Sequence, residues 1–225
     1  MDDTEIMRQL IPINFQQAVM EETPEGHFYR TPTGNRYASS TTILGATNAE
    51  KDEILKAWRV RVGREVAQYI TDESAIIGTE VHTMIEYYIN GCFLPISPRL
   101  ISQAHFNNLK SLVNKIDNFY GNEIRLWDDK LGIAGTADNI SYYNGKLSVV
   151  DYKTKRRPQK EEYLWDHYLQ LSSYAYMFQK LEGVKVEQVV LLISSETNSR
   201  QEFIVDPRNY FIPLVKRIKM YYEKM

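Results

Sequence analysis

The apolar residues in the first half of the chain recur at helical spacing. Over residues 49–70 they fall every three or four positions, which predicts an amphipathic helix. This apolar stripe consists of Leu55, Trp58, Val62, Val66 and Ile70. Residues 78–91 are expected to continue as helix and to end at Asn90–Gly91. Upstream, residues 27–44 predict a short hairpin around Pro32–Gly34, followed by an extended stretch.

A further helix is predicted over residues 97–121. Ser97 is a favoured N-cap residue, Pro98 suits the first helical position, and Gly121 lies beyond the expected end. The apolar stripe of this helix is formed by Ile101, Leu109, Leu112, Val113 and Ile116. The N-terminal half is therefore expected to be largely helical.

After residue 121 the period of the apolar residues changes from helical to extended. Three β-rich segments, "EIRLWDD", "IAGTADNISYY" and "KLSVVDYKT", are separated by short turns. A long helix is predicted over residues 161–183, with Gly183 as its stop. Two more strands, "VEQVVLLISSE" and "RQEFIVD", and a helical segment after Pro207 complete the chain. This order predicts an α/β fold in which a mixed central sheet is flanked by helices.

The composition narrows the chemistry that is available. The chain is 43% hydrophobic and 25% charged, and it has no apolar run of about 18 residues, so we expect no membrane span. Its acidic start, "MDDTEIMRQL", is unlike a secretory or transit peptide, which favours a cytoplasmic location. Cys92 is the single cysteine, which excludes an intrachain disulfide, a four-thiolate zinc site and a cysteine-ligated iron–sulfur cluster. The net charge of −2 means that nucleic acid would need a local basic patch.

The turn at Asn144–Gly145 is expected to bring two carboxylates together. Asn–Gly between alternating segments is a strong signal for a two-residue hairpin. Equal steps outward from an unbulged turn place Asp138 opposite Asp151, in a non-hydrogen-bonded pair whose Cβ atoms lie roughly 4.5–5.5 Å apart. Lys153 projects from the same face as Asp151.

Two interpretations of this carboxylate pair are open from the residues alone. Facing carboxylates repel each other, so they favour a cation between them, and a hard divalent ion prefers oxygen ligands. Alternatively, both aspartates lie on a solvated sheet face and Lys153 neutralises them. A bulge in either strand would break the register.

Four motifs in this order resemble those of the PD-(D/E)XK nuclease superfamily, and more narrowly its RecB-type branch. They are "GTEVH" at 78–82, "GTADN" at 135–139, "VVDYKT" at 149–154 and "QLSSY" at 170–174. The stretch "SSTTIL…LKAWRVRVG…IIGTEVHTMIEYYI" is further similar to phage and mitochondrial genome maintenance exonucleases, and the single cysteine fits members without an iron–sulfur cluster. The resemblance extends over residues 28–205 and implies a restriction-endonuclease-like core.

The resemblance also implies a set of metal ligands. Asp138 and Asp151 would bind Mg²⁺ or Mn²⁺, together with the backbone carbonyl of Tyr152 and the imidazole of His82. A lone histidine on a helix is otherwise a surface or core-edge residue. Glu86, one turn after His82, would orient the imidazole or be a solvated acid.

The resemblance further implies that three residues act on the substrate. Lys153 would orient or help to deprotonate the attacking water and would stabilise charge on the transition state. Gln170 and Tyr174, four residues apart and therefore on one helix face, would contact the scissile phosphate or the water. For Tyr174, packing in the core is the alternative.

Candidate DNA contacts lie in three places. Lys155, Arg156 and Arg157 follow Lys153 in a basic run that would neutralise phosphates or would be a solvated strand end. Arg61 is expected on one helical side with Arg64 within "WRVRVGR" (58–64). By resemblance, Ser40 and Thr41 would donate to phosphates, with strand and cap roles as the alternative. By the same resemblance, the helix at 97–121 would form an arch that admits only single strands.

We therefore expect a Mg²⁺- or Mn²⁺-dependent deoxyribonuclease, a phosphodiester hydrolase that acts as an exonuclease on single-stranded DNA or DNA ends. Its setting would be DNA replication, recombination or repair, or phage DNA metabolism, in a bacterium or a phage-infected cell. The alternatives are a structure-selective endonuclease, a catalytically inactive nuclease fold that binds DNA, and an unrelated α/β protein with a solvated acidic hairpin.

No repeat or linker divides the 225 residues, so we expect a single domain. It would contain a peripheral N-terminal segment (1–48), a helical part (49–121), a catalytic sheet and helix (122–206) and a C-terminal helix (207–225).

Overall fold

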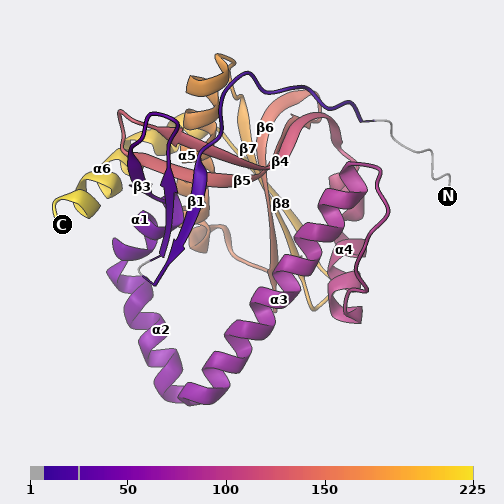
Figure 1. The fold of residues 1–225 in the computed structure, drawn as a ribbon. Helices are drawn as coiled ribbons and strands as arrows, with labels where there is room; N and C mark the ends of the chain where they lie inside the picture. Colours follow the sequence, from indigo (N-terminus) through magenta and orange to yellow (C-terminus); the bar gives the residue numbers. More distant parts are fainter. Residues whose placement is uncertain (1–7, 25, 225) are drawn as a thin grey trace.

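The helices of the protein surround one large sheet, and a small sheet packs beside it (Figure 1). The computed structural model describes residues 8–24 and 26–224. The small sheet has the order β1 (Val19–Thr23), β2 (Gly26–Arg30), β3 (Arg36–Ala38). The large sheet has the order β4 (Ile116–Asp128), β5 (Ile133–Tyr143), β6 (Lys146–Lys155), β7 (Gln188–Ser195), β8 (Arg200–Val205).

The large sheet is mixed, as the sequence predicted. Strands β6 and β7 run parallel, whereas the β4–β5, β5–β6 and β7–β8 pairs are antiparallel. The crossover between the parallel strands is helix α5 (Trp165–Glu182), which follows a 3₁₀ turn at Glu161–Tyr163. Gly183 ends α5 in the left-handed conformation, with φ at 78°, which glycine adopts without steric cost. The predicted α/β fold, a mixed central sheet flanked by helices, is confirmed.

Two hydrophobic clusters lie on opposite faces of the large sheet. Along β6, Val149 belongs to the cluster that contains α5, whereas Val150 belongs to the cluster that contains α3 (Arg64–Ile89) and α4 (Leu100–Val113). The same alternation separates Leu191 from Leu192 on β7. Because helices cover both faces, all of β7 is buried, which explains its continuous apolar run.

The helices of the N-terminal half have different bounds from those predicted. Helix α2 (Ala49–Val62) ends at Gly63, whose φ of 87° interrupts the helix, and α3 then runs unbroken to Ile89. The predicted helix over 49–70 was therefore wrong in its bounds. Its apolar residues also do not pack into the core. Helix α2, which is described in full, has no buried residue, and Val66 of α3 is half exposed. Helix α2 and the N-terminal part of α3 project from the sheets as a V, here called the α2–α3 arm (Figure 1).

The prediction of a helix over 97–121 was also wrong in its bounds. Helix α4 begins after Arg99, not at a Ser97 cap, and ends at Val113, because Ile116 already pairs with Tyr143 in the large sheet. Tertiary pairing has overridden the local helical pattern there. Helix α4 packs along α3 and β7, so the projecting element is the α2–α3 arm and not residues 97–121.

The hairpin around Pro32–Gly34 is present between β2 and β3, with Arg30 opposite Arg36. The extended stretch predicted after it is limited to Arg36–Ser39, and the prediction was wrong beyond that point, because Ser40–Ala46 form helix α1. The side chain of Ser39 accepts a hydrogen bond from the Thr42 N–H, and this N-cap outweighs the low helical preference of the two threonines.

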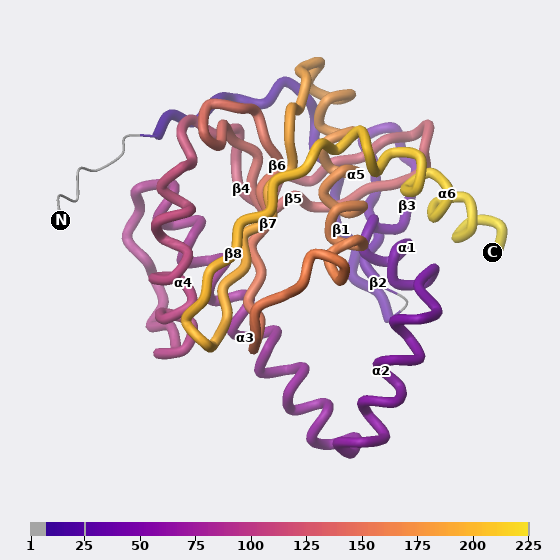
Figure 2. The backbone as a smooth tube through the Cα atoms, turned by 180° about the vertical axis from the view of Figure 1, so that it is seen from behind, coloured from indigo at the N-terminus to yellow at the C-terminus, as the bar shows by residue number. Residues whose placement is uncertain are grey.

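Helix α6 (Phe211–Tyr222) follows a 3₁₀ turn at Pro207–Tyr210 and packs on α1 and α5. Pro213 lies in its first turn, where the missing N–H removes no helical hydrogen bond. Seen from behind in Figure 2, α6 and α4 lie at opposite sides of the molecule. Across residues 8–24 and 26–224, every helix is too short or too polar to cross a bilayer.

Candidate active site

The β5–β6 hairpin has the register that the Asn144–Gly145 turn predicted. Tyr143 lies opposite Lys146, and the pairing continues unbroken to Asn139 and Val150. The next positions outward are those of Asp138 and Asp151. At that level the strands stop exchanging ladder bonds, and the backbone N–H of Tyr152 instead donates to Oδ2 of Asp138 (3.2 Å). The hairpin therefore brings the two aspartates together at the point where β5 and β6 separate.

His82, from α3, reaches this same point from the other side of the sheet. Its Nε2 atom lies 2.8 Å from the backbone carbonyl oxygen of Tyr152, and its Nδ1 atom lies 3.5 Å from Oδ2 of Asp138. The imidazole also packs edge-on against the Tyr152 ring. His82, Asp138 and the Tyr152 carbonyl, three of the metal ligands predicted from the sequence, thus lie close together. His82 and Tyr152 are 70 residues apart in the chain.

Asp151 and Lys153 form a close ion pair beside this cluster. The Lys153 ammonium lies 2.7 Å from Oδ1 and 2.6 Å from Oδ2 of Asp151, which is 1% exposed. Burial raises the pKa of Asp151, and the Lys153 ammonium opposes this effect. Burial alone would lower the pKa of Lys153, but the Asp151 and Asp138 carboxylates outweigh it and raise that pKa. Lys153 is therefore held in its charged form next to the cluster.

Glu123 is a further acidic side chain of the site, and it was absent from the sequence prediction. Its neighbours on β4 pair as Asn122 with Asn139 and Ile124 with Ala137, so Glu123 falls opposite Asp138. Ligand-type atoms of His82, Glu123 and Asp138 all lie within 4.8 Å of one another. Burial against the cavity wall and the Asp138 carboxylate raise the pKa of Glu123 to about 7, although the side chain remains accessible to solvent.

A signal for Glu123 was present in the sequence. The turn at residues 129–132 joins β4 to β5 with Asp128 opposite Ile133, and equal steps outward from it lead to Glu123 and Asp138. This turn lacks an Asn–Gly pair at its centre, so its register was harder to assign than that of the following hairpin.

Gln170 and Tyr174 lie one turn apart on α5 and contact each other. The Gln170 amide donates to the Tyr174 hydroxyl at 3.2 Å, and both side chains line the cavity of the site. The Tyr174 ring is buried, and it packs on Gly135 so closely that a Cβ atom there would lie 2.6 Å from its Cε1 atom. Tyr174 therefore takes part in the core and also presents its hydroxyl to the cavity.

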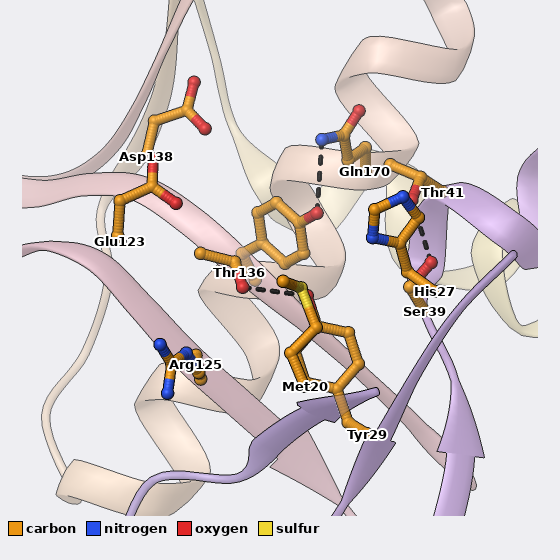
Figure 3. Close-up of a pocket in the computed structure, with 11 residues that line it drawn as sticks. Met20, His27, Tyr29, Ser39, Thr41, Glu123, Arg125, Thr136, Asp138 and Gln170 are labelled. Atoms are coloured by element: carbon orange, nitrogen blue, oxygen red, sulfur yellow. Dashed lines mark hydrogen bonds between the residues drawn. The ribbon is translucent and has the colours of Figure 1, made fainter. Parts of the chain in front are cut away.

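A cavity of about 440 Å³ opens beside the carboxylates (Figure 3). The carboxylates of Glu123 and Asp138 lie at one end of it, and His27 and Thr41 lie at the other. Tyr29 of β2 lines the cavity between them and bonds through its hydroxyl to Thr136 (2.8 Å). The N-terminal segment, expected to be peripheral, thus supplies one wall of this cavity.

The basic residues after Lys153 lie at the end of β6 and in the loop beyond it. Lys155 is partly buried, and desolvation together with the positive charges of Lys153 and Lys51 lowers its pKa. Arg156 is exposed and its Nε atom lies 3.9 Å from Glu196, and Arg157 is exposed as well. Arg61 and Arg64, the other basic residues proposed from the sequence, lie on the α2–α3 arm.

Two predicted DNA contacts do not have the surroundings expected of them. The Ser40 side chain is 2% exposed, and its hydroxyl donates to the Ala134 carbonyl and accepts from Ser173, so it faces the interior. Arg61 belongs to α2 and Arg64 to α3, with the Gly63 break between them, so they do not share one helical side. Thr41, by contrast, is exposed and lines the cavity.

The groups at this site fit a hard divalent cation. They are carboxylates, an imidazole and a backbone carbonyl, which are ligands that Mg²⁺ and Mn²⁺ accept. Oδ2 of Asp151 is buried and forms an ion pair with the Lys153 ammonium at 2.6 Å, but it accepts no well-formed hydrogen bond within the described part of the chain. This oxygen therefore keeps lone-pair capacity that a metal ion can use.

Residues 118–219 match the sequence model of the PD-(D/E)XK nuclease superfamily. The matched region extends from β4 to α6 and contains Asp138, Asp151 and Lys153. The match, which covers somewhat less than half of the chain, supports the PD-(D/E)XK nuclease superfamily, whose members use divalent metal ions. The narrower RecB-type assignment stays a prediction.

Two solved structures resemble this chain at low sequence identity. A proposed exonuclease from Eubacterium rectale has 11% identity and a TM-score of 0.45, aligned over 67% of this chain and 65% of its own. A phage-related exonuclease from Haemophilus somnus 129PT has 13% identity and a TM-score of 0.33, over 65% of this chain and 81% of its own. The chain thus spans less than two thirds of the Eubacterium rectale protein. No curated protein sequence is significantly similar to it.

Proposed function

We propose that this nuclease is a Mg²⁺- or Mn²⁺-dependent deoxyribonuclease that acts as an exonuclease on single-stranded DNA or DNA ends. The observation that carries the proposal is the convergence of His82, Asp138 and the Tyr152 carbonyl beside the Asp151–Lys153 ion pair. A solvated acidic hairpin would need no histidine from a distant helix.

His82, Asp138, Asp151 and the carbonyl of Tyr152 are the residues that would hold the cation. A divalent ion at such a site lowers the pKa of a bound water and polarises a phosphoryl oxygen. The Asp151 carboxylate fixes the Lys153 ammonium by two short contacts. Because the pKa of Lys153 is raised, its positive charge persists and can stabilise negative charge that develops on the phosphate.

Gln170 and Tyr174 are proposed to position the phosphate or the attacking water. The Gln170 amide donates to the Tyr174 hydroxyl, which leaves the Tyr174 O–H free to donate into the cavity. The rigid ring of Tyr174, held against Gly135, fixes where that hydroxyl points. Both side chains are therefore preorganised and do not depend on the substrate for their orientation.

The proposed path of the DNA follows the cavity and the basic residues around it. The cavity of about 440 Å³ has room for an unpaired nucleotide next to Asp138, and Thr41 lies at its far end. Lys155, Arg156 and Arg157 would neutralise phosphates on the other side of the ion pair. The α2–α3 arm, with Arg61 near its bend, would offer a second contact to the strand. We place this activity in DNA replication, recombination, repair or phage DNA metabolism.

The test uses three single-stranded DNA substrates: one labelled at the 5′ end, one labelled at the 3′ end, and one circular. With Mg²⁺ or Mn²⁺, the linear strands should be degraded progressively from an end and the circle should survive, and EDTA should stop the reaction. Cleavage of the circle would establish the endonuclease alternative. DNA binding without cleavage under any divalent ion would establish the inactive alternative.

A further inference from the structure

We infer that Glu123 is an additional carboxylate ligand of the cation in this site. The inference rests on the metal dependence in the proposed function and deepens it, because the resemblance pointed only to His82, Asp138, Asp151 and Tyr152. Glu123 lies outside all four motifs, on the strand that precedes the "GTADN" segment.

The position of Glu123 is fixed by strand pairing. It falls opposite Asp138 between two regular pairs, Asn122 with Asn139 and Ile124 with Ala137. Side chains that face each other across antiparallel strands are close neighbours. Figure 3 shows the two carboxylates side by side at the end of the cavity, and the ligand atoms of both lie within 4.8 Å of the His82 imidazole. This separation suits groups that share a single ion.

The backbone at Glu123 is unusual in a way that brings the side chain to this place. Its φ is 51°, in the left-handed region that residues other than glycine seldom occupy. The β4–β5 ladder is irregular just before it, with a register shift between Phe119 and Gly121. A bulge re-aims the side chains beside it, and a conformation of this kind is maintained by its surroundings at an energetic cost. If Glu123 were only a solvated surface residue, nothing would favour keeping its backbone in this costly conformation.

The Glu123 carboxylate has no cation of its own. It forms no hydrogen bond or ion pair with any residue in 8–24 or 26–224, and Arg125, on the same strand, makes no ion pair with it. Lys153 is committed to Asp151 through both carboxylate oxygens. When both are ionised, Glu123 and Asp138 therefore face each other as like charges, with the partly exposed His82 beside them and the charge of Arg125 acting on Glu123 without an ion pair. A bound divalent ion would remove that repulsion.

The experiment measures Mn²⁺ binding directly, by electron paramagnetic resonance of free Mn²⁺ and by calorimetry, without DNA. We expect Glu123→Gln to weaken Mn²⁺ binding by at least the roughly 10-fold that loss of a supporting group near a metal costs. Glu123→Asp should also bind more weakly, because the shorter side chain retracts the carboxylate while its charge stays. Asp tolerates the left-handed conformation better than Glu, so folding should be preserved.

The matched control is Glu22→Gln, which removes an exposed negative charge that acts on Tyr29, as Glu123 does, but lies outside the ligand group. The Mn²⁺ affinity of this variant should stay close to that of the wild type. Equal weakening by Glu22→Gln and Glu123→Gln would show that only local charge matters and would overturn the inference. Unchanged binding by Glu123→Gln, with strong loss in Asp138→Asn, would overturn it as well. Absence of Mn²⁺ binding by the wild type would instead contradict the proposed metal dependence itself.

Discussion

Gly135 and Tyr174 fit together so closely that no other residue can replace the glycine without moving the tyrosine. A Cβ atom at Gly135 would lie 2.6 Å from Cε1 of the Tyr174 ring and 3.3 Å from its hydroxyl. Gly135 belongs to the segment that carries Asp138, and Tyr174 carries the hydroxyl to which Gln170 donates. The glycine of one motif therefore makes room for the tyrosine of another.

Gly135→Ala should consequently reduce both stability and cleavage. The added methyl group forces the buried ring aside, and overpacking of this kind costs about 1–3 kcal/mol in free energy of unfolding. Urea denaturation and the cleavage rate on labelled single-stranded DNA measure the two effects. Gly45→Ala is the control, because no described atom lies within 4 Å of its Cβ position in α1, so it should be neutral or slightly stabilising. Full activity in Gly135→Ala would mean that the ring position is unimportant.

Asp151→Ala and Lys153→Ala should each abolish cleavage while leaving the fold intact. The two variants should differ in stability. Lys153→Ala leaves the buried Asp151 carboxylate without its cation, and loss of one partner from a buried pair costs up to about 3–5 kcal/mol. Because Lys153 is about a quarter exposed, we expect a smaller loss than that range. Circular dichroism, thermal unfolding and the nuclease assay check this, and normal cleavage by either variant with Mg²⁺ present would refute the assignment of the site.

Ser40 and Thr41 should give opposite results although they are adjacent. Ser40→Ala removes a buried hydroxyl that links Ser173 to the Ala134 carbonyl, so unfolding free energy should fall by about 1 kcal/mol while DNA binding by the folded protein is retained. Thr41→Ala alters the exposed end of the cavity, so DNA affinity should fall while stability is nearly unchanged. The pair is compared by chemical denaturation and by fluorescence anisotropy with a labelled single strand. A loss of affinity confined to Ser40→Ala would contradict this assignment.

His105 should make the protein less stable in mild acid. Its imidazole is buried between α4 and β7, where Nδ1 lies 2.9 Å from the Ser194 hydroxyl, and burial lowers its pKa. The folded state thus favours the neutral ring, so the stabilisation is present above the unfolded pKa of about 6.5 and is lost as the pH falls below it. Denaturation at pH 8 and pH 5 should show a smaller difference for His105→Gln than for the wild type. The exposed His27, replaced by Gln, should retain the wild-type difference.

Local sequence signals determined the strands of the large sheet and the register of its central hairpin. Asn144–Gly145 fixes a two-residue turn through its own backbone preferences, and that turn alone aligns Asp138 with Asp151. Gly183 likewise ends α5 by a local conformational preference. The motifs around these residues were sufficient to indicate the superfamily and the position of the Lys153 side chain next to Asp151.

Tertiary packing decided what local patterns could not. The apolar stripe of residues 49–70 has the spacing of a buried helix, but burial depends on a facing partner, and α2 projects from the sheets with no buried residue. The local sequence around Ser40 predicts a surface residue, but in the fold its hydroxyl is buried and bonded to Ser173, which lies far along the chain. Glu123 joins His82 and Asp138 only because an irregular strand and a distant helix meet at the point where β5 and β6 part. Turns are set by the dihedral preferences of a few residues, whereas burial and the convergence of a site depend on contacts between residues far apart in the sequence.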